Sequence, residues 1–302
     1  MTLEVLADLF LSNRIDQHWD YSGLDSPESN FDKKKFWHYP YDISYDYNSR
    51  GFRDVEWPLD NKSLSDAIWC VGDSFTVGLG APITHTWPYL LQQITHCRTI
   101  NVALDGASNN WIARRACDIL RAVQPRNMVI MLSFAERRES SLDNFVNTAW
   151  HSYYQDVRDA TWPEPPSYHD FHLLPESIRQ ELQQNHKLMF GQISADSNRL
   201  ELTCTFDEER REQWMRPDDE NLANFVECVQ QIQQAQGSTN IVWSIIPGVI
   251  DSTAPALAHE FSKLTPQIPP FKSLDLARDG FHFGIITAQW IADQVTPLLN
   301  LQ

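Results

Sequence analysis

The chain has 302 residues, 42% of them hydrophobic, which is enough for one large α/β domain and too apolar for a disordered chain. Lysine and arginine number 24 against 40 aspartates and glutamates, and the net charge of −16 argues against nucleic acid and anionic membranes as partners. Five scattered cysteines form no CxxC pair, so neither a zinc site nor a disulfide framework is expected.

The N-terminal sequence lacks the features of a targeting segment. MTLEVLADLFLSNRIDQHWDYSG has no basic start and no long apolar core, so it does not read as a signal peptide. No apolar run in the chain approaches the roughly 18 residues of a membrane span. We therefore expect a soluble protein that is cytoplasmic at synthesis.

Residues 1–60 are predicted to form an N-terminal arm. A short amphipathic helix is predicted from Leu3 to Leu11, and the rest is rich in Asp, Tyr, Asn and Ser with few periodic apolar positions. The segment FWHYPYDISYDYNSRGFRD is aromatic and rich in turn residues. We expect this arm to pack on a main domain formed by residues 61–302.

The main domain alternates between apolar strands and amphipathic helices. Strands are predicted at 67–71, 98–104, 127–134 and 240–248, with helices after Thr86, at 110–123, at 218–236 and at the C-terminus. Residues 140–216, which contain several prolines and aromatics, break this rhythm and are predicted to be an insertion. Near-continuous apolar strands separated by helices indicate an α/β fold, a three-layer α/β/α sandwich with a parallel sheet.

Candidate catalytic residues lie where the predicted strands end, because sites in such sheets lie at the carboxyl ends of the strands. The first strand runs into Gly72-Asp73-Ser74, which is neither a phosphate-binding loop nor the G-x-S-x-G motif. A serine nucleophile needs a base, and the base needs an orienting group. Asp279 precedes His282 by three residues in DGFHF. At that spacing the carboxylate can reach Nδ1 of His282 and leave Nε2 for Ser74.

These blocks resemble those of the SGNH (GDSL-type) hydrolase family. VGDSFTVGLG resembles the first block, NVALDGASNN the second and DGFHFG the last, while YNSRGFRDVEW resembles a segment often found upstream of the domain. The resemblance implies a flavodoxin-like SGNH sheet and a triad of Ser74, His282 and Asp279. It implies an oxyanion hole that includes the backbone N–H groups of Ser74 and Gly106, and no metal or organic cofactor.

The third block departs from the family pattern. The family's asparagine, whose amide completes the oxyanion hole, is missing, and SFAERRES follows the third strand instead. Losing one such donor costs about 10²–10³ in rate. Three alternatives follow: Arg137 or Arg138 stabilises the oxyanion or binds an anionic group of the substrate, Asn109 or Asn110 supplies the amide, or the site is weak or inactive.

The predicted reaction is hydrolysis of a small acyl ester, such as an acetyl group on a carbohydrate. The predicted substrate-binding residues are Asp73, His85, Arg137 and Arg138. The expected partner is a small-molecule or glycan ester, with no nucleic acid and no membrane, and the oligomeric state is left open. Two alternatives remain: an O-acyltransferase with the same triad, and a catalytically inactive SGNH-like binding or structural protein, as in a phage virion.

Overall fold

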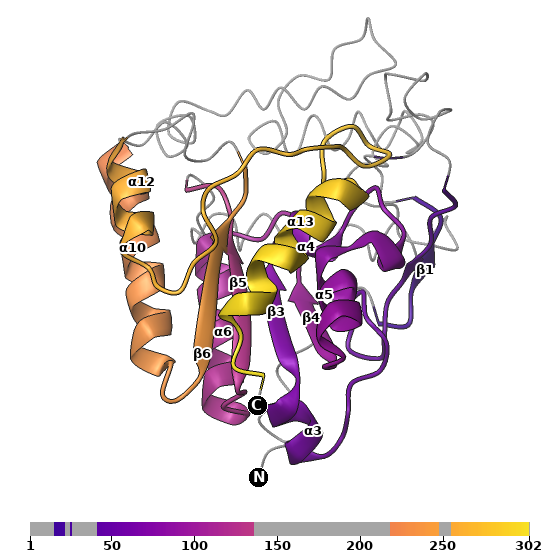
Figure 1. The fold of residues 1–302 in the computed structure, drawn as a ribbon, viewed down its shortest axis with the longest axis horizontal. Coiled ribbons are helices and arrows are strands. Elements are labelled where there is room, and N and C mark those ends of the chain that lie inside the picture. The colour runs from indigo at the N-terminus through magenta and orange to yellow at the C-terminus, as the bar shows by residue number, and fades with distance from the viewer. Residues whose placement is uncertain (1–14, 22–24, 26–40, 136–217, 248–254, 302) are drawn as a thin grey trace, which may run out of the picture.

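A computed structural model of the chain describes residues 15–21, 25, 41–135, 218–247 and 255–301 (Figure 1). The predicted helix at 3–11 and the predicted insertion at 140–216 lie outside these residues. The elements are, in chain order, β1 His18–Trp19, β2 Tyr45–Asp46, α3 Asn61–Asp66, β3 Ile68–Gly72, α4 Ser74–Val77, η3 Ile83–His85, α5 Trp87–Thr95, β4 Thr99–Ala103, α6 Asn109–Ala122, β5 Asn127–Leu132, α10 Asp218–Ala235, β6 Asn240–Ile245, α12 Pro255–Ser262, α13 Ile285–Val295 and η5 Thr296–Leu298.

Four strands form a parallel sheet in the order β4-β3-β5-β6. A further parallel contact extends it beyond β6, where Trp243 N–H donates to Pro266 O and Ile268 N–H donates to Trp243 O, each at 3.0 Å. The chain leaves β3 toward β4 and then returns to β5 on the other side of β3. Such a reversal opens a crevice at the carboxyl ends of β3 and β5, which is the usual ligand position in α/β sheets.

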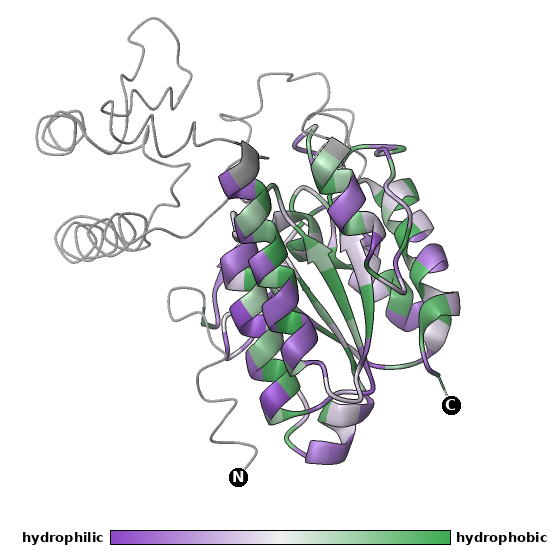
Figure 2. Cartoon of the chain, turned by 90° about the vertical axis from the view of Figure 1, so that its left-hand side faces the viewer, coloured by the Kyte–Doolittle hydropathy of each residue, from purple (hydrophilic) through white to green (hydrophobic). Residues whose placement is uncertain are grey.

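Helices cover both faces of this sheet, which confirms the predicted α/β/α layers. α6 packs with α10 on one face and α5 packs with α13 on the other (Figure 1). Figure 2 shows the strands between the two helical layers, with hydrophilic residues on the outer sides of the helices. Four of the apolar positions predicted for α6 are buried, namely Ile112, Ala116, Ile119 and Leu120, and Val123, just after the helix, is partly buried. Among the described residues, no helix combines the length and apolar character needed to cross a membrane.

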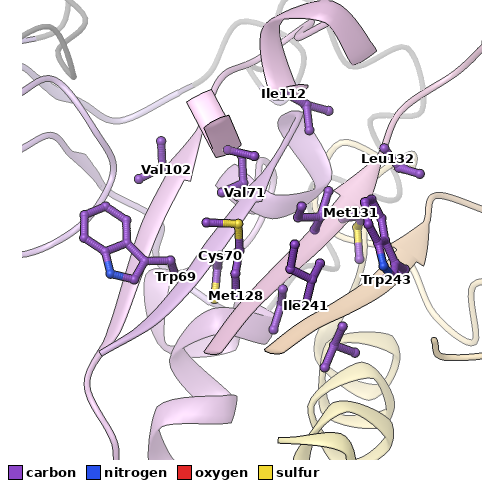
Figure 3. Close-up of a cluster of buried hydrophobic side chains, with 14 of the residues drawn as sticks. Trp69, Cys70, Val71, Val102, Ile112, Met128, Met131, Leu132, Ile241 and Trp243 are labelled. Atoms are coloured by element: carbon purple, nitrogen blue, oxygen red, sulfur yellow. The ribbon is translucent and has the colours of Figure 1, made fainter. Parts of the chain in front are cut away.

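The hydrophobic core lies around β3 and β5. Every residue of β3, β4 and β5 is buried, because helices cover both sides of these strands. Figure 3 shows part of this core, with the labelled side chains Trp69, Cys70, Val71, Val102, Ile112, Met128, Met131, Leu132, Ile241 and Trp243. This core fixes the strands, and the strands fix the positions of the loops at their carboxyl ends.

The described part of the N-terminal arm packs beside α4 and β4. Ile43, Tyr45 and Tyr47 form a buried cluster whose other members are Val77, Leu79 and Ala103. The buried guanidinium of Arg53 donates to the carbonyls of Gly78 (2.5 Å) and Ala81 (2.8 Å) and lies over the Tyr45 ring. These contacts attach the arm to the loop that follows α4, whereas the domain boundary at residue 60 stays a prediction.

Candidate active site

Ser74 lies where β3 turns into the short helix α4. Asp73 caps this helix, because its Oδ1 accepts a hydrogen bond from Phe75 N–H at 3.1 Å. Gly72 lets α4 pack closely against the end of β3, since a Cβ on it would lie 2.1 Å from Thr76 Oγ1. Ser74 is only 2% exposed, so its hydroxyl sits in a shielded position at the carboxyl end of the sheet.

Asp73 also spans the crevice between β3 and β5. Its Oδ2 accepts a hydrogen bond from Ser133 Oγ at 2.6 Å, and Ser133 directly follows β5. Asp73 is fully buried and both of its carboxylate oxygens accept protein hydrogen bonds. The carboxylate therefore links the turn at Ser74 to the loop after β5, and its predicted contact with substrate stays a prediction.

Asn109 joins the loop after β4 to the same framework. Its Oδ1 accepts from Ser133 N–H at 2.9 Å, and its Nδ2 donates to the carbonyls of Ser133 (3.2 Å) and Phe134 (3.1 Å). The Asn109 amide, one of the predicted substitutes for the missing oxyanion donor, thus already donates to two backbone carbonyls. Asn110 Nδ2 donates to Asn224 Oδ1 at 2.9 Å, on α10.

Gly106 lies in the loop between β4 and α6 and has the left-handed φ of +71°. Among the described residues, no atom would lie within 4 Å of a Cβ built on Gly106. Asp105, next to it, is one of the charged groups that act on His282. Asp105 was not among the predicted site residues, and its place beside the predicted oxyanion donor was its one signal in the sequence.

Asp279 and His282 form the contact that their spacing predicts. Asp279 Oδ2 lies 2.5 Å from His282 Nδ1, while Oδ1 accepts from the backbone N–H groups of Phe281 (2.9 Å) and His282 (3.0 Å). Both side chains are 1% exposed. Ala277 N–H donates to His282 O at 2.9 Å and closes the loop around the pair. A carboxylate held in this way fixes both the orientation and the tautomer of the imidazole.

The electrostatics of this pair favour a basic histidine. Burial lowers the pKa of His282, but the nearby carboxylates of Asp279, Asp105 and Asp73 raise that pKa above 6.5 overall. Burial raises the pKa of Asp279, but His282 and two backbone N–H groups lower that pKa below 3.8 overall. Asp279 therefore stays ionised, and Nδ1–H of His282 points toward it.

His282 Nε2 is buried and has no hydrogen-bond partner among the described residues. Both sequence neighbours of Ser74 lie near the His282 ring. The centroid of the Phe75 ring is 4.6 Å from that of His282, and the charge of Asp73 raises the pKa of His282. Ser74 and His282 therefore belong to the same end of the sheet, although no hydrogen bond joins the hydroxyl to Nε2 in this structure.

The remaining predicted site residues are His85, Arg137 and Arg138. His85 is in η3, where its ring lies edge-on to Tyr41 at 4.3 Å between centroids, and burial lowers its pKa. Arg137 and Arg138 are outside the described residues, so their roles stay predictions. In the part of the chain that the structure describes, no three His, Cys, Asp or Glu side chains gather as a metal site would require.

No protein-family model and no curated protein sequence matches this chain. Its structure is similar to that of a protein from Desulfitobacterium hafniense DCB-2 assigned to the lipolytic G-D-S-L family, at 11% identity and a TM-score of 0.40, over 78% of this chain and 99% of that one. It is also similar to TesA (15%, TM-score 0.41, 78% and 99%) and to the psychrotrophic esterase EstA from Pseudoalteromonas sp. (14%, TM-score 0.39, 77% and 95%). At such low identities and TM-scores, the similarity concerns the fold alone. No residue's role follows from it.

Proposed function

We propose that this protein is a serine ester hydrolase, with Ser74 as nucleophile, His282 as general base and Asp279 as the group that orients the base. The observation that carries the proposal is the state of the buried His282 ring. Its Nδ1 is held on Asp279, while Nε2 is buried without a partner among the described residues. An unpaired buried polar atom costs about 1–3 kcal/mol, and a catalytic base kept ready for a proton accounts for that cost.

In the acylation step, Ser74 Oγ attacks the ester carbonyl carbon and its proton moves to His282 Nε2. The carbonyl electrons move to the oxygen and form a tetrahedral oxyanion, for which the N–H groups of Ser74 and Gly106 are the proposed donors. Collapse of this intermediate breaks the bond to the alcohol, which leaves with the proton from His282. The acyl group remains on Ser74.

In the deacylation step, His282 Nε2 takes a proton from water while the water oxygen adds to the acyl carbon. The second tetrahedral intermediate collapses, the carboxylic acid leaves, and the proton on His282 returns to Ser74 Oγ. Asp279 keeps its negative charge throughout and stabilises the transient imidazolium. The third oxyanion donor is left to Arg137 or Arg138 in this proposal.

We extend the proposal to small acyl esters of carbohydrates. Phe281 is half exposed, lies beside His282 at 5.0 Å between ring centroids, and packs on Phe75 at 5.3 Å. An exposed aromatic face next to the base can stack on a sugar ring or on another flat apolar group. The acidic surface, with a net charge of −16, fits a neutral substrate better than a polyanionic one.

The first test is labelling with a fluorophosphonate, followed by mass spectrometry of the modified peptide. We expect the label on Ser74 in the wild type and in Ser65→Ala, a control in α3, which precedes β3, and no label in Ser74→Ala. The labelling rate should rise with pH through a midpoint above 6.5, because only neutral His282 accepts the proton and its pKa is raised. A folded protein that takes no label contradicts the proposal and favours a binding role for this edge of the sheet.

A further inference from the structure

We infer that the N-terminal arm positions the triad: Asp25, Tyr45 and Arg278 form a buried hydrogen-bonded ring that holds the Asp279 loop against the loop after Ser74. The catalytic meaning of this ring rests on the proposed function. The ring is called the arm ring below, and it also includes the backbone of Gly80.

Asp25 is the acceptor at the centre of the arm ring. Its Oδ2 accepts from Arg278 Nη2 at 2.7 Å, from Arg278 Nε at 3.1 Å and from Tyr45 OH at 2.6 Å. Asp25 and Tyr45 have no exposed surface, and Arg278 is 8% exposed. The two charges neutralise each other, so the arm ring adds no net charge beside the triad.

The arm ring closes through the backbone. Tyr45 OH accepts from Gly80 N–H at 2.8 Å, and Gly80 O accepts from Arg278 N–H at 2.8 Å. The hydrogen bonds therefore run from Asp25 through Arg278 and Gly80 to Tyr45 and back to Asp25. A closed ring of this kind fixes two segments of backbone relative to each other, because moving either segment breaks bonds on two sides.

Those two segments carry the proposed catalytic groups. Arg278 directly precedes Asp279, and Gly80 lies in the loop that follows the helix of Ser74. The Asp279 carboxylate rests against Gly80, since a Cβ on this glycine would lie 2.9 Å from Asp279 Cγ. A loosened arm ring would let Asp279 move, and His282 would follow through the Nδ1 contact. A misplacement of about 1 Å can cost on the order of 10²-fold in rate.

The arm has other contacts that suffice to attach it to the domain. Ile43 and Tyr47 belong to a buried apolar cluster, and Arg53 donates to two carbonyls of the loop after α4. Burying an ion pair such as Asp25–Arg278 brings little net stability compared with apolar packing. Its position directly beside Asp279 therefore indicates a positioning role in addition to attachment.

The test compares Tyr45→Phe with Tyr47→Phe. The first substitution removes only the hydroxyl of the arm ring, and the second removes a hydroxyl from a buried tyrosine of the same arm whose ring packs on Trp19. We measure the fluorophosphonate labelling rate of Ser74 against pH and the NMR resonance of the His282 Nδ1 proton. In Tyr45→Phe we expect the rate to fall about 10- to 100-fold, the midpoint to move down toward 6.5 and the resonance to broaden. Tyr47→Phe should leave all three unchanged.

Arg278→Lys provides a second variant if Tyr45→Phe does not fold, since lysine keeps the charge opposite Asp25 but loses the two-nitrogen contact. The inference is overturned if the folded variants lose stability while the labelling rate, its midpoint and the Nδ1 resonance stay as in the wild type. If the proposed function is wrong instead, the experiment gives a different result. Wild-type Ser74 would take no label, whereas the Nδ1 resonance would still respond to Tyr45→Phe if the arm ring positions Asp279.

Discussion

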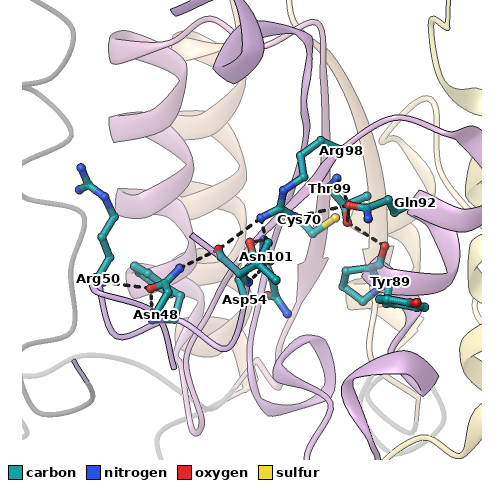
Figure 4. Close-up of polar contacts among 12 residues, drawn as sticks. Asn48, Arg50, Asp54, Cys70, Tyr89, Gln92, Arg98, Thr99 and Asn101 are labelled. Carbon is teal, nitrogen blue, oxygen red and sulfur yellow. Dashed lines mark hydrogen bonds and ion pairs between the residues drawn. The ribbon is translucent and has the colours of Figure 1, made fainter. Parts of the chain in front are cut away.

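Two buried aspartates, Asp279 in the candidate site and Asp54 at the edge of the sheet, have pKa values shifted in opposite directions. Asp54 accepts from Arg98 Nη2 at 2.8 Å, from Val55 N–H at 2.9 Å and from Asn101 N–H at 3.0 Å (Figure 4). Burial raises the pKa of Asp54 to about 6, even though these donors lower it. The pKa of Asp279 is also raised by burial, yet its donors lower it below 3.8.

The partner of each carboxylate accounts for the difference. The Asp279 side chain is 1% exposed and Asp54 is 9% exposed, so burial alone would predict the reverse order. His282 is 1% exposed and meets Asp279 at 2.5 Å, whereas the Arg98 side chain is 24% exposed. A charge pair is stronger where water is excluded from both partners. The candidate site thus keeps the Asp279 carboxylate ionised. Asp54 instead accepts a hydrogen bond from a backbone N–H of the edge strand β4, which would otherwise be unpaired.

The largest effect is expected when the Asp279 carboxylate is replaced by an amide, with the same replacement at Asp54 as the comparison. Asp279→Asn should lower the rate of Ser74 labelling by about 10⁴-fold, because an amide in place of this carboxylate stabilises the wrong tautomer of the base. Asp54→Asn is the matched control, since it removes another largely buried aspartate charge, 9% exposed, and should change the rate less than about 3-fold. Labelling rates of the two purified variants at pH 8 measure this contrast. A comparable loss in both would show that the rate follows general stability, and the comparison would break down.

A smaller effect is expected on the pH dependence of stability. The folded pKa of Asp54 lies above the unfolded value of 3.8, so its contribution is present below about pH 3.8 and is lost as the pH rises through about 6. The difference corresponds to about 3 kcal/mol. Asp279, whose folded pKa is lowered, contributes in the opposite sense: above pH 3.8, with loss as the pH falls through its folded value.

Urea unfolding between pH 3.5 and pH 7.5 tests the Asp54 half of this statement. The stability of the wild type relative to Asp54→Asn should decrease by about 3 kcal/mol as the pH rises across this range. Asp60→Asn is a control of opposite sign, because Asp60 caps α3 and the Ser63 N–H lowers its pKa. If the stability of the wild type relative to Asp54→Asn increases with pH instead, Arg98 lowers the pKa of Asp54 more than burial raises it. The pKa values of Asp54 and Asp279 would then be shifted in the same direction.

Local patterns in the sequence account for the parts of the fold that could be predicted. The apolar runs gave β3 and β5 within two residues of their observed ends, because burial on both faces demands apolar side chains at every position. The Asp279–His282 contact was predictable for a similar reason. Both residues lie in one short loop, so their spacing limits where the carboxylate can go.

Contacts between distant segments could not be predicted. Asp25 and Arg278 are 253 positions apart, and Asp73 and Ser133 are 60 apart. Neither pair leaves a periodic signal, because only the folded sheet brings the loops together. The contact of Ser133 Oγ with Asp73 was therefore not predictable, whereas the substrate contact expected of Asp73 stays a prediction.

The smallest effect is expected at Asn101, which connects the two regions. Its N–H binds Asp54, while its Nδ2 donates to Thr76 O in α4 at 2.9 Å. Its Oδ1 is buried without a partner among the described residues. Asn101→Leu keeps the N–H and removes one hydrogen bond, worth about 1 kcal/mol, along with the unpaired oxygen. We expect a change in unfolding free energy of at most about 1 kcal/mol and a change in labelling rate below about 3-fold.

Asn101→Asp separates the two halves of this connection. A carboxylate cannot donate to the Thr76 carbonyl and places a second negative charge near Asp54, so it should destabilise more than leucine does. Both variants leave the Asp279–His282 pair in place, and their effect on labelling should stay small if the site is held by its own loops and by the arm ring. A loss of labelling above about 10-fold in folded Asn101→Leu would mean that the edge of the sheet controls Ser74 through α4. Asp54 would then belong with Asp279 as a group that shapes the site.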